Sequence, residues 1–135
     1  MKRSEKITGI LTGMITLLLL LLAIYSVAAA YHEKKDGTPF FVLGWKPVLV
    51  LSDSMEPTFH AGSILIVREQ GTEEPEPGDI VMFPIETGRE QAYVTHRIVS
   101  REQDGYITKG DNNNARDFGF RAREDILGTV THILF

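Results

Sequence analysis

The chain has 135 residues, no cysteine and a formal net charge of −4 at pH 7, and this length suffices for one small domain. The lack of cysteine excludes a disulfide framework, a thiol nucleophile and a thiolate metal site. The negative charge argues against nucleic acid as a partner, because a protein that binds nucleic acid needs a basic face.

The N-terminal segment predicts a membrane anchor. Residues 7–31 carry no charge and include an unbroken leucine run at 17–22. At about 1.5 Å per residue, a helix of this length crosses the roughly 30 Å hydrocarbon core of a bilayer with some tilt. The tail 1–6 contains Lys2, Arg3 and Lys6 against one acid, Glu5. The positive-inside rule therefore predicts a single-pass protein of the cell membrane with a cytoplasmic N-terminus and an extracytoplasmic C-terminal domain.

The same segment also fits a cleavable secretory signal. Basic residues precede the apolar run, and the small residues Ala28, Ala29 and Ala30 lie near its end. The apolar region of such a signal is usually about 7–15 residues long, which is shorter than this one, so a retained anchor is favoured. Both interpretations export the C-terminal domain.

The remainder of the chain predicts a juxtamembrane linker at residues 32–38 and a domain at residues 39–135. This domain contains short apolar and β-branched runs separated by turn residues, and no long stretch has helical periodicity. We therefore predict a mostly β fold, with a single small β-rich domain behind one transmembrane helix. The expected strands are 40–43, 47–51, 63–67, 79–83, 93–100, 105–108 and 127–134.

Two segments of the domain lack this pattern. Residues 69–79, "EQGTEEPEPGD", hold five acids, two prolines and two glycines, which predicts a solvated loop. Residues 109–125, "KGDNNNARDFGFRARED", predict either a long turn or a functional loop, because long irregular loops often carry binding and catalytic residues.

Ser54 is a candidate nucleophile. It follows the apolar run 48–51 and precedes Pro57, which restricts the backbone of Glu56 to extended geometry. A serine held at the end of a strand by a restrained turn has little entropy left to lose when it meets a substrate. A serine in an ordinary surface turn fits the same pattern.

His96 is the candidate base for this serine, since a hydroxyl is a weak nucleophile until a neighbouring base accepts its proton. Strand alternation puts Val94, His96 and Ile98 on one face and Thr95 and Arg97 on the other. A histidine on an apolar strand face is either a structural residue satisfied by a hydrogen bond or a half-buried general base.

The other histidines are less suitable. His32 lies beside the predicted membrane span, His60 falls in an apparent turn six residues after Ser54, and His132 lies in the last strand-like run, where it fits a core residue with a hydrogen-bond partner.

A histidine base is usually oriented by a third group, and Asp104, Asp111 and Asp117 are the nearby aspartates downstream of His96. Asp104 precedes Gly105 in a predicted hairpin turn, whereas Asp111 and Asp117 frame the asparagine-rich loop. Asp111 also fits a residue that caps its own turn. Spacing alone leaves the orienting role open.

Three blocks in order resemble the type I signal peptidases, in particular the serine–histidine subclass of the endoplasmic reticulum, archaea and Gram-positive spore formers. They are "VLSDSMEPTF", then "PGDIVMF" with "THRIV", then "TKGDNNNARD" leading into "ILGTV". The resemblance covers the chain from about residue 41 to its C-terminus. It implies a membrane-anchored serine endopeptidase that cuts signal peptides from exported preproteins after small residues, with no metal and no cofactor.

The resemblance also implies residue roles. Ser54 becomes the nucleophile and His96 the general base, at a position where the common bacterial enzymes have lysine. Asp117 best matches the third member of the triad, and Asp111 is the second choice. Ser52 corresponds to a hydroxyl that helps the Ser54 backbone N–H to stabilise an oxyanion.

Two positions depart from the family pattern. Asp53 stands where the family usually has glycine, and aspartate tolerates a positive φ better than most residues if the turn requires one. Gly62 and Ser63 replace a glycine–aspartate pair, and we expect this position to be structural.

The expected partners are preprotein signal peptides and the lipid bilayer, with no nucleic acid, and the sequence leaves open whether other membrane proteins join a complex. One alternative is a membrane-tethered β-rich binding module without catalysis. A second is a relative of the self-cleaving repressors, which share a "DSMEP" box and a β fold but use a lysine base and carry a DNA-binding domain.

Overall fold

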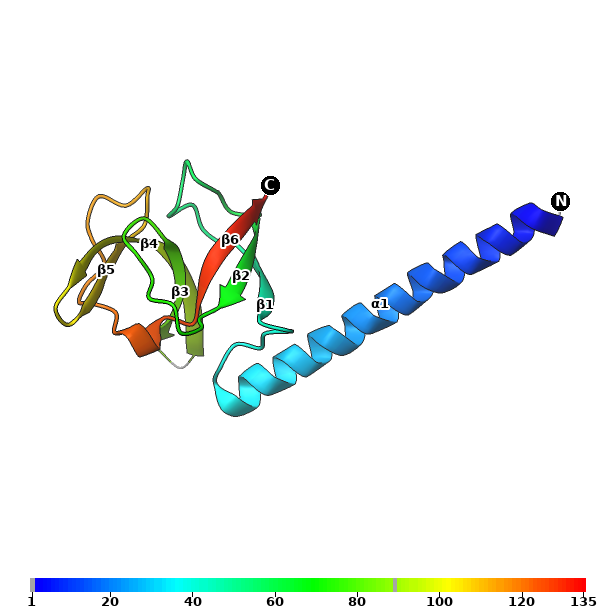
Figure 1. Ribbon diagram of the computed structural model, residues 1–135, viewed down its shortest axis with the longest axis horizontal. Coiled ribbons are helices and arrows are strands. Elements are labelled where there is room, and N and C mark those ends of the chain that lie inside the picture. Colours follow the sequence, from blue (N-terminus) through cyan, green and yellow to red (C-terminus); the bar gives the residue numbers. More distant parts are fainter. Residues whose placement is uncertain (1, 89) are drawn as a thin grey trace. The chain divides into compact units, whose positions relative to one another are not determined.

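The computed structural model describes residues 2–88 and 90–135, which form two compact units that divide after Phe40. Figure 1 shows one long helix in the first unit and a small sheet in the second. In chain order the elements are α1 (Lys2–Asp36), β1 (Trp45–Leu49), β2 (Ile64–Glu69), β3 (Ile80–Thr87), β4 (Glu90–Glu102), β5 (Gly105–Lys109), the 3₁₀ helix η1 (Arg123–Asp125) and β6 (Gly128–Leu134).

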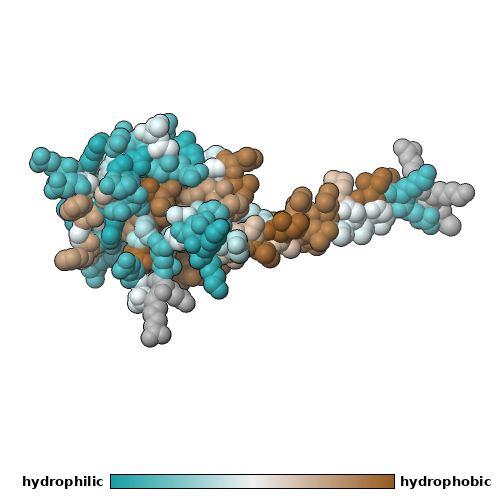
Figure 2. Space-filling view, turned by 90° about the horizontal axis from the view of Figure 1, so that it is seen from below, coloured by the Kyte–Doolittle hydropathy of each residue, from teal (hydrophilic) through white to brown (hydrophobic). Residues whose placement is uncertain are grey.

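Helix α1 is apolar on all sides over most of its length. Its large apolar side chains are exposed, and Figure 2 shows hydrophobic residues covering the middle of the helix. The segment Ser4–Asp36 is long and apolar enough to cross a membrane. The hydroxyls of Thr8, Thr12 and Thr16 each donate to the carbonyl four residues earlier at 2.9 Å. These bonds satisfy the hydroxyls inside the helix, as an apolar surrounding requires.

The helix continues through residues 32–36, beyond the apolar run. Lys34 and Lys35 lie in the last turn, where the helix dipole favours cations. Gly37 has a φ of 65° and ends the helix, and its N–H donates to the Glu33 carbonyl at 3.0 Å. Most of the segment expected to be a linker is therefore helical.

The second unit contains a six-stranded antiparallel sheet in the order β1-β2-β6-β3-β4-β5. Strand β6 joins the two halves, because it pairs with β2 along its length and with β3 only near Gly128. A Cβ at Gly128 would lie 2.6 Å from the Arg68 carbonyl oxygen, so this crossing needs glycine. The prediction of a mostly β fold with one apolar N-terminal helix is confirmed.

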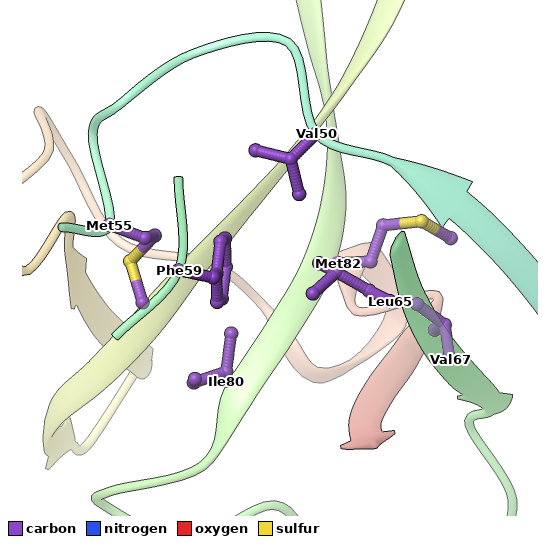
Figure 3. Close-up of a cluster of buried hydrophobic side chains, with 7 residues drawn as sticks. All are labelled: Val50, Met55, Phe59, Leu65, Val67, Ile80 and Met82. Carbon is purple, nitrogen blue, oxygen red and sulfur yellow. The ribbon is translucent and has the colours of Figure 1, made fainter. Parts of the chain in front are cut away.

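Strand β3 separates two hydrophobic clusters. Its alternate side chains point to opposite faces, so Ile80 and Met82 enter one cluster while Val81 and Phe83 enter the other. The first cluster, drawn in Figure 3, is completed by Val50, Met55, Phe59, Leu65 and Val67. The second is completed by Ile98, Tyr106 and Ile126. Each face of β4, which pairs with β3, therefore adjoins a different cluster.

One predicted strand is wrong. The run 40–43 forms no strand, and Val42 pairs with Trp45 in an isolated bridge, through two hydrogen bonds of 2.9 Å. Leu43 and Gly44 both have positive φ, 50° and 81°, and turn the chain back between these two residues. The other six runs all contribute to strands, because each has a partner strand on which to place its apolar side chains.

The acidic loop 69–79 connects β2 and β3 as expected, but its side chains also bind the domain. Glu74 accepts hydrogen bonds from the Tyr106 hydroxyl at 2.5 Å and from Arg101 at 3.1 Å. The Tyr106 hydrogen bond lowers the pKa of Glu74, and burial raises the pKa of Tyr106. The loop is thus exposed and also held in place.

Candidate active site

Ser54 lies in the loop that connects β1 to β2. The base of this loop is closed by two backbone hydrogen bonds of 2.9 Å, from Val50 N to Ser63 O and from Gly62 N to Val50 O. Met55, which follows the serine, is only 1% exposed and packs in the first hydrophobic cluster with Phe59. The loop is therefore fixed to the core on both sides of a half-buried Ser54.

Asp53 adopts no positive φ, so the unusual aspartate needs no special backbone here. Its Oδ1 accepts a hydrogen bond from the Ala61 N–H at 2.8 Å, across the loop. The acidic side chain therefore has a structural partner within the loop. The adjacent Glu56–Pro57 peptide is cis.

His96 lies on β4, opposite Val81 of β3, and is 8% exposed. Val94 and Ile98 pack with the second hydrophobic cluster, which confirms the face predicted from alternation. The ring of Phe83 meets the imidazole edge-on, with 6.2 Å between ring centroids. The imidazole is thus held by apolar neighbours, and its two nitrogens remain for polar contacts.

Those two nitrogens connect Ser54 to Asp117. His96 Nε2 lies 3.2 Å from Ser54 Oγ, and His96 Nδ1 lies 2.7 Å from Asp117 Oδ2. A carboxylate only accepts, so Nδ1 carries the proton and Nε2 is left free to accept the Ser54 hydroxyl hydrogen. The arrangement can therefore move a proton from the serine to the histidine while the carboxylate stabilises the resulting positive charge.

Thr108 fixes the carboxylate of Asp117. The Thr108 hydroxyl donates to Asp117 Oδ2 at 2.7 Å, and Asp117 N donates back to the Thr108 carbonyl at 2.8 Å. Thr108 is 1% exposed on β5. Sequence reasoning missed this residue. Strand alternation in the sequence could have indicated it, because alternation places the side chains of Thr108 and Tyr106 on the same, inner face of β5.

Asp111 binds on the opposite side of β4. Its carboxylate accepts from Arg97 Nε at 2.9 Å and from Arg97 Nη2 at 2.7 Å, and it also accepts from the Thr58 hydroxyl. The hydrogen bonds from Arg97 hold the pKa of Asp111 below its usual value, and the same pairing raises the pKa of Arg97. The structure thus brings Asp117 to His96 and Asp111 to Arg97.

Ser52 lies close to the nucleophile candidate. Its Oγ donates to Ser54 Oγ at 3.3 Å. Within residues 2–88 and 90–135, the Ser54 N–H donates to no protein acceptor. The Ser52 hydroxyl and the Ser54 N–H are therefore two donors beside the Ser54 side chain, the kind of donor pair that stabilises an oxyanion.

A cleft of about 270 Å³ runs past Ser54 and His96. One wall comes from the end of β1 and the residues that follow it, and the other comes from β4. The lining residues are Val48, Leu49, Val50, Leu51, Ser52, Ser54, Phe59, Tyr93, Val94, Thr95, His96 and Asn113. Strand β1 is an edge strand of the sheet, so backbone groups are available beside the cleft.

The remaining candidates lie elsewhere. His60 contacts Ser63 Oγ at 3.4 Å, and Ser63 is fully buried, in keeping with the structural position expected for it. His132 is exposed and contacts Thr131, so the expectation of a core residue is wrong. Asp104 lies in the turn between β4 and β5, as predicted.

In the part of the chain that the structure describes, no group of three or more His, Cys, Asp or Glu residues is suited to hold a metal ion.

The model of the family "Signal peptidase, peptidase S26" matches residues 10–102, which include Ser54 and His96. Signal peptidase I W of Bacillus subtilis (strain 168) is 34% identical over 127 residues, 90% of this chain and 65% of the relative. The signal peptidase complex catalytic subunit SEC11 of Metarhizium robertsii is 38% identical over 95 residues, 62% of this chain and 54% of the relative. The signal peptidase complex catalytic subunit SEC11C of Homo sapiens is 42% identical over 99 residues, which are 64% of this chain and 50% of the relative. The chain spans less than two thirds of the length of each relative.

Proposed function

The chain belongs to the signal peptidase family, peptidase S26, and from this membership we propose that it is a membrane-anchored serine endopeptidase that removes signal peptides from exported preproteins. The observation that carries the proposal is the line of contacts from Ser54 Oγ through His96 to Asp117, at 3.2 and 2.7 Å. The relatives' names supply the substrate class.

In the first step Ser54 Oγ attacks the carbonyl carbon of the scissile peptide bond. His96 Nε2 accepts the hydroxyl proton, and Asp117 keeps the imidazole in the required tautomer and stabilises its positive charge. The tetrahedral intermediate then collapses, and His96 returns the proton to the leaving amine. The new N-terminus of the mature protein departs, while the signal peptide remains as an ester on Ser54.

In the second step water replaces the departed amine. His96 Nε2 takes a proton from this water, whose oxygen attacks the ester carbonyl carbon, and the proton then passes to Ser54 Oγ as the signal peptide leaves as a carboxylic acid. In both steps negative charge develops on the former carbonyl oxygen. The Ser54 N–H and the Ser52 hydroxyl stabilise this oxyanion, and such donors typically contribute about 2.7–4 kcal/mol each.

Substrate binding follows from the cleft beside the nucleophile. An extended peptide aligned with the edge strand β1 gains main-chain hydrogen bonds, while shallow apolar pockets select small side chains before the cut. This preference matches the A-x-A sites at which signal peptides are cut. The alternative of a non-catalytic binding module uses the same cleft without turnover.

The anchor keeps the enzyme at the membrane, where the apolar helix of a signal peptide also resides. We assign residues 7–31 to the hydrocarbon core of the cell membrane, the tail 1–6 to the cytoplasm, and the peptidase domain to the extracytoplasmic face, by the positive-inside rule.

Cleavage of a preprotein by the full chain in detergent micelles tests the proposed activity. We expect Ser54→Ala to abolish turnover while the melting temperature stays unchanged. Ser100→Ala is the matched control, because Ser100 lies on β4 and, among the described residues, its hydroxyl bonds to Glu102 alone. Normal turnover by a folded Ser54→Ala variant would contradict the assignment, and binding without turnover by the wild-type protein would favour the binding module.

Labelling with a membrane-impermeant maleimide tests the orientation in intact cells. The chain has no native cysteine, so Ser4→Cys and Ser100→Cys each introduce one thiol. We expect label on Ser100→Cys in intact cells and on Ser4→Cys only after permeabilisation. The reverse pattern would invert the topology.

A further inference from the structure

The turn after β5 is bonded to the backbone on both sides of Ser54. Asn112 N donates to the Ser54 carbonyl at 2.9 Å, and Asn112 Nδ2 donates to the Asp53 carbonyl at 3.1 Å. The turn lies very close to the nucleophile, since a Cβ at Gly110 would be 2.6 Å from Ser54 O. A substitution at Gly110 would therefore separate the two segments.

The second of these hydrogen bonds acts on the oxyanion donor itself. The Asp53 carbonyl and the Ser54 N–H belong to one planar trans peptide group, so they point in opposite directions and turn together. The Asp53 carbonyl also accepts from Glu56 N at 3.2 Å, within the same short turn. The hydrogen bond from the Asn112 side-chain amide connects this peptide group to a part of the chain that is distant in sequence.

We propose that Asn112 is a positioning residue for the oxyanion site: its side-chain amide holds the Asp53–Ser54 peptide group so that the Ser54 N–H points into the site. This inference rests on the proposed function and extends it to a residue with no direct contact to the reacting atoms. Donation to the carbonyl also polarises the peptide group and strengthens its N–H as a donor.

The role requires a donor at position 112, and it acts in the transition state. An aspartate has the shape of asparagine but presents only acceptor oxygens when ionised, so it repels the Asp53 carbonyl. The ground-state carbonyl of the substrate has little charge, whereas the oxyanion has much. Loss of the Asn112 amide therefore lowers kcat and leaves KM nearly unchanged.

The test compares Asn112→Asp and Asn112→Ala with the wild-type full chain. We expect kcat for preprotein cleavage to fall about tenfold, which is less than the roughly 10²–10³-fold loss of a whole oxyanion donor. The matched control is Asn114→Asp. Asn114 is exposed in the same loop, so this variant adds the same charge and is expected to retain wild-type kcat.

A pair of substrate-like inhibitors separates positioning from general damage. A peptide aldehyde forms a hemiacetal when Ser54 Oγ adds to its carbonyl carbon, and its oxygen then occupies the oxyanion site, whereas the matching peptide alcohol only fills the cleft. We expect Asn112→Asp and Asn112→Ala to lower the affinity for the aldehyde about tenfold and to leave the affinity for the alcohol unchanged. Because the alcohol reports only folded sites, this ratio stays interpretable in a destabilised variant.

The possible outcomes are distinct. If the wild-type protein cleaves preprotein and both Asn112 variants keep its kcat and its aldehyde-to-alcohol ratio, the positioning role is wrong and the proposed function stands. An equal loss of affinity for the aldehyde and for the alcohol would also overturn the positioning role. If the wild-type protein cleaves nothing and forms no adduct with the aldehyde, the proposed function fails and this inference fails with it.

Discussion

Arg97 binds Asp111 through two hydrogen bonds, from Nε at 2.9 Å and from Nη2 at 2.7 Å. The preceding residue, His96, binds Asp117 at 2.7 Å. Successive side chains on a strand point to opposite faces, so β4 directs its histidine to one aspartate and its arginine to the other. The two carboxylates of one loop therefore bind different side chains.

We predict that Asp111→Asn destabilises the domain and lowers activity along with stability. The change leaves the part-buried Arg97 guanidinium without its charged partner, which typically costs about 1–3 kcal/mol. For a domain of this size, each kcal/mol lowers the melting temperature by roughly 4–8 °C. Thermal melts in detergent measure the effect, and an unchanged melting temperature would contradict the structural role.

The same carboxylate makes stability depend on pH. The hydrogen bonds from Arg97 hold the pKa of Asp111 below its value in the unfolded chain, which is about 3.9. A depressed pKa contributes stability above the unfolded value, and that contribution disappears as the pH falls through the folded value. The stability difference between wild type and Asp111→Asn is therefore expected to be full at pH 6 and to shrink below about pH 4. Denaturant titrations at pH 6 and below about pH 4 measure this difference in the free energy of unfolding. A difference that is the same at both pH values would contradict the interpretation.

Asp117→Asn is expected to keep the fold and lose most activity. An asparagine amide at this position can donate to Nδ1, which moves the imidazole proton to Nε2 and leaves no acceptor for the Ser54 hydroxyl. The corresponding change in a well-studied triad lowers kcat by about 10⁴. Asp104→Asn, in the β4–β5 turn, is the control. A stable but inactive Asp111→Asn together with an active but unstable Asp117→Asn would transfer the triad role to Asp111.

His96→Lys is expected to be inactive, although the common bacterial type I signal peptidases, which differ from this chain at that position, have a lysine base there. A lysine base must be neutral, and a neutral amine needs a site that disfavours charge. Here the carboxylate that lies 2.7 Å from His96 Nδ1 would stabilise the charged ammonium. Cleavage assays at neutral pH measure the effect, with His132→Lys, an exposed position, as control. Substantial turnover by His96→Lys would show that the site accepts either base.

The sequence alone indicated a large part of the fold. The uncharged run 7–31 predicts a span because only helices satisfy their backbone within so long an apolar segment, and α1 includes all of it. Alternation in "YVTHRIVS" predicted the face of His96, because strand geometry fixes that relation locally. The prediction of a strand at 40–43 was wrong, since no strand of the described part of the chain pairs with this run and the chain turns back at Leu43 and Gly44.

Which residues meet in the candidate site could be decided only from the tertiary structure. From the residues alone, both an ordinary surface turn and a nucleophile stayed open for Ser54, and its distance from His96 along the chain carries no information about their contact. The choice between Asp111 and Asp117 was open for a related reason. The loop that holds both has no periodicity, so its path is set by distant partners: Arg97 for one carboxylate, and Thr108 with His96 for the other. Local sequence determines which way a strand residue points, whereas only the folded chain determines what it meets there.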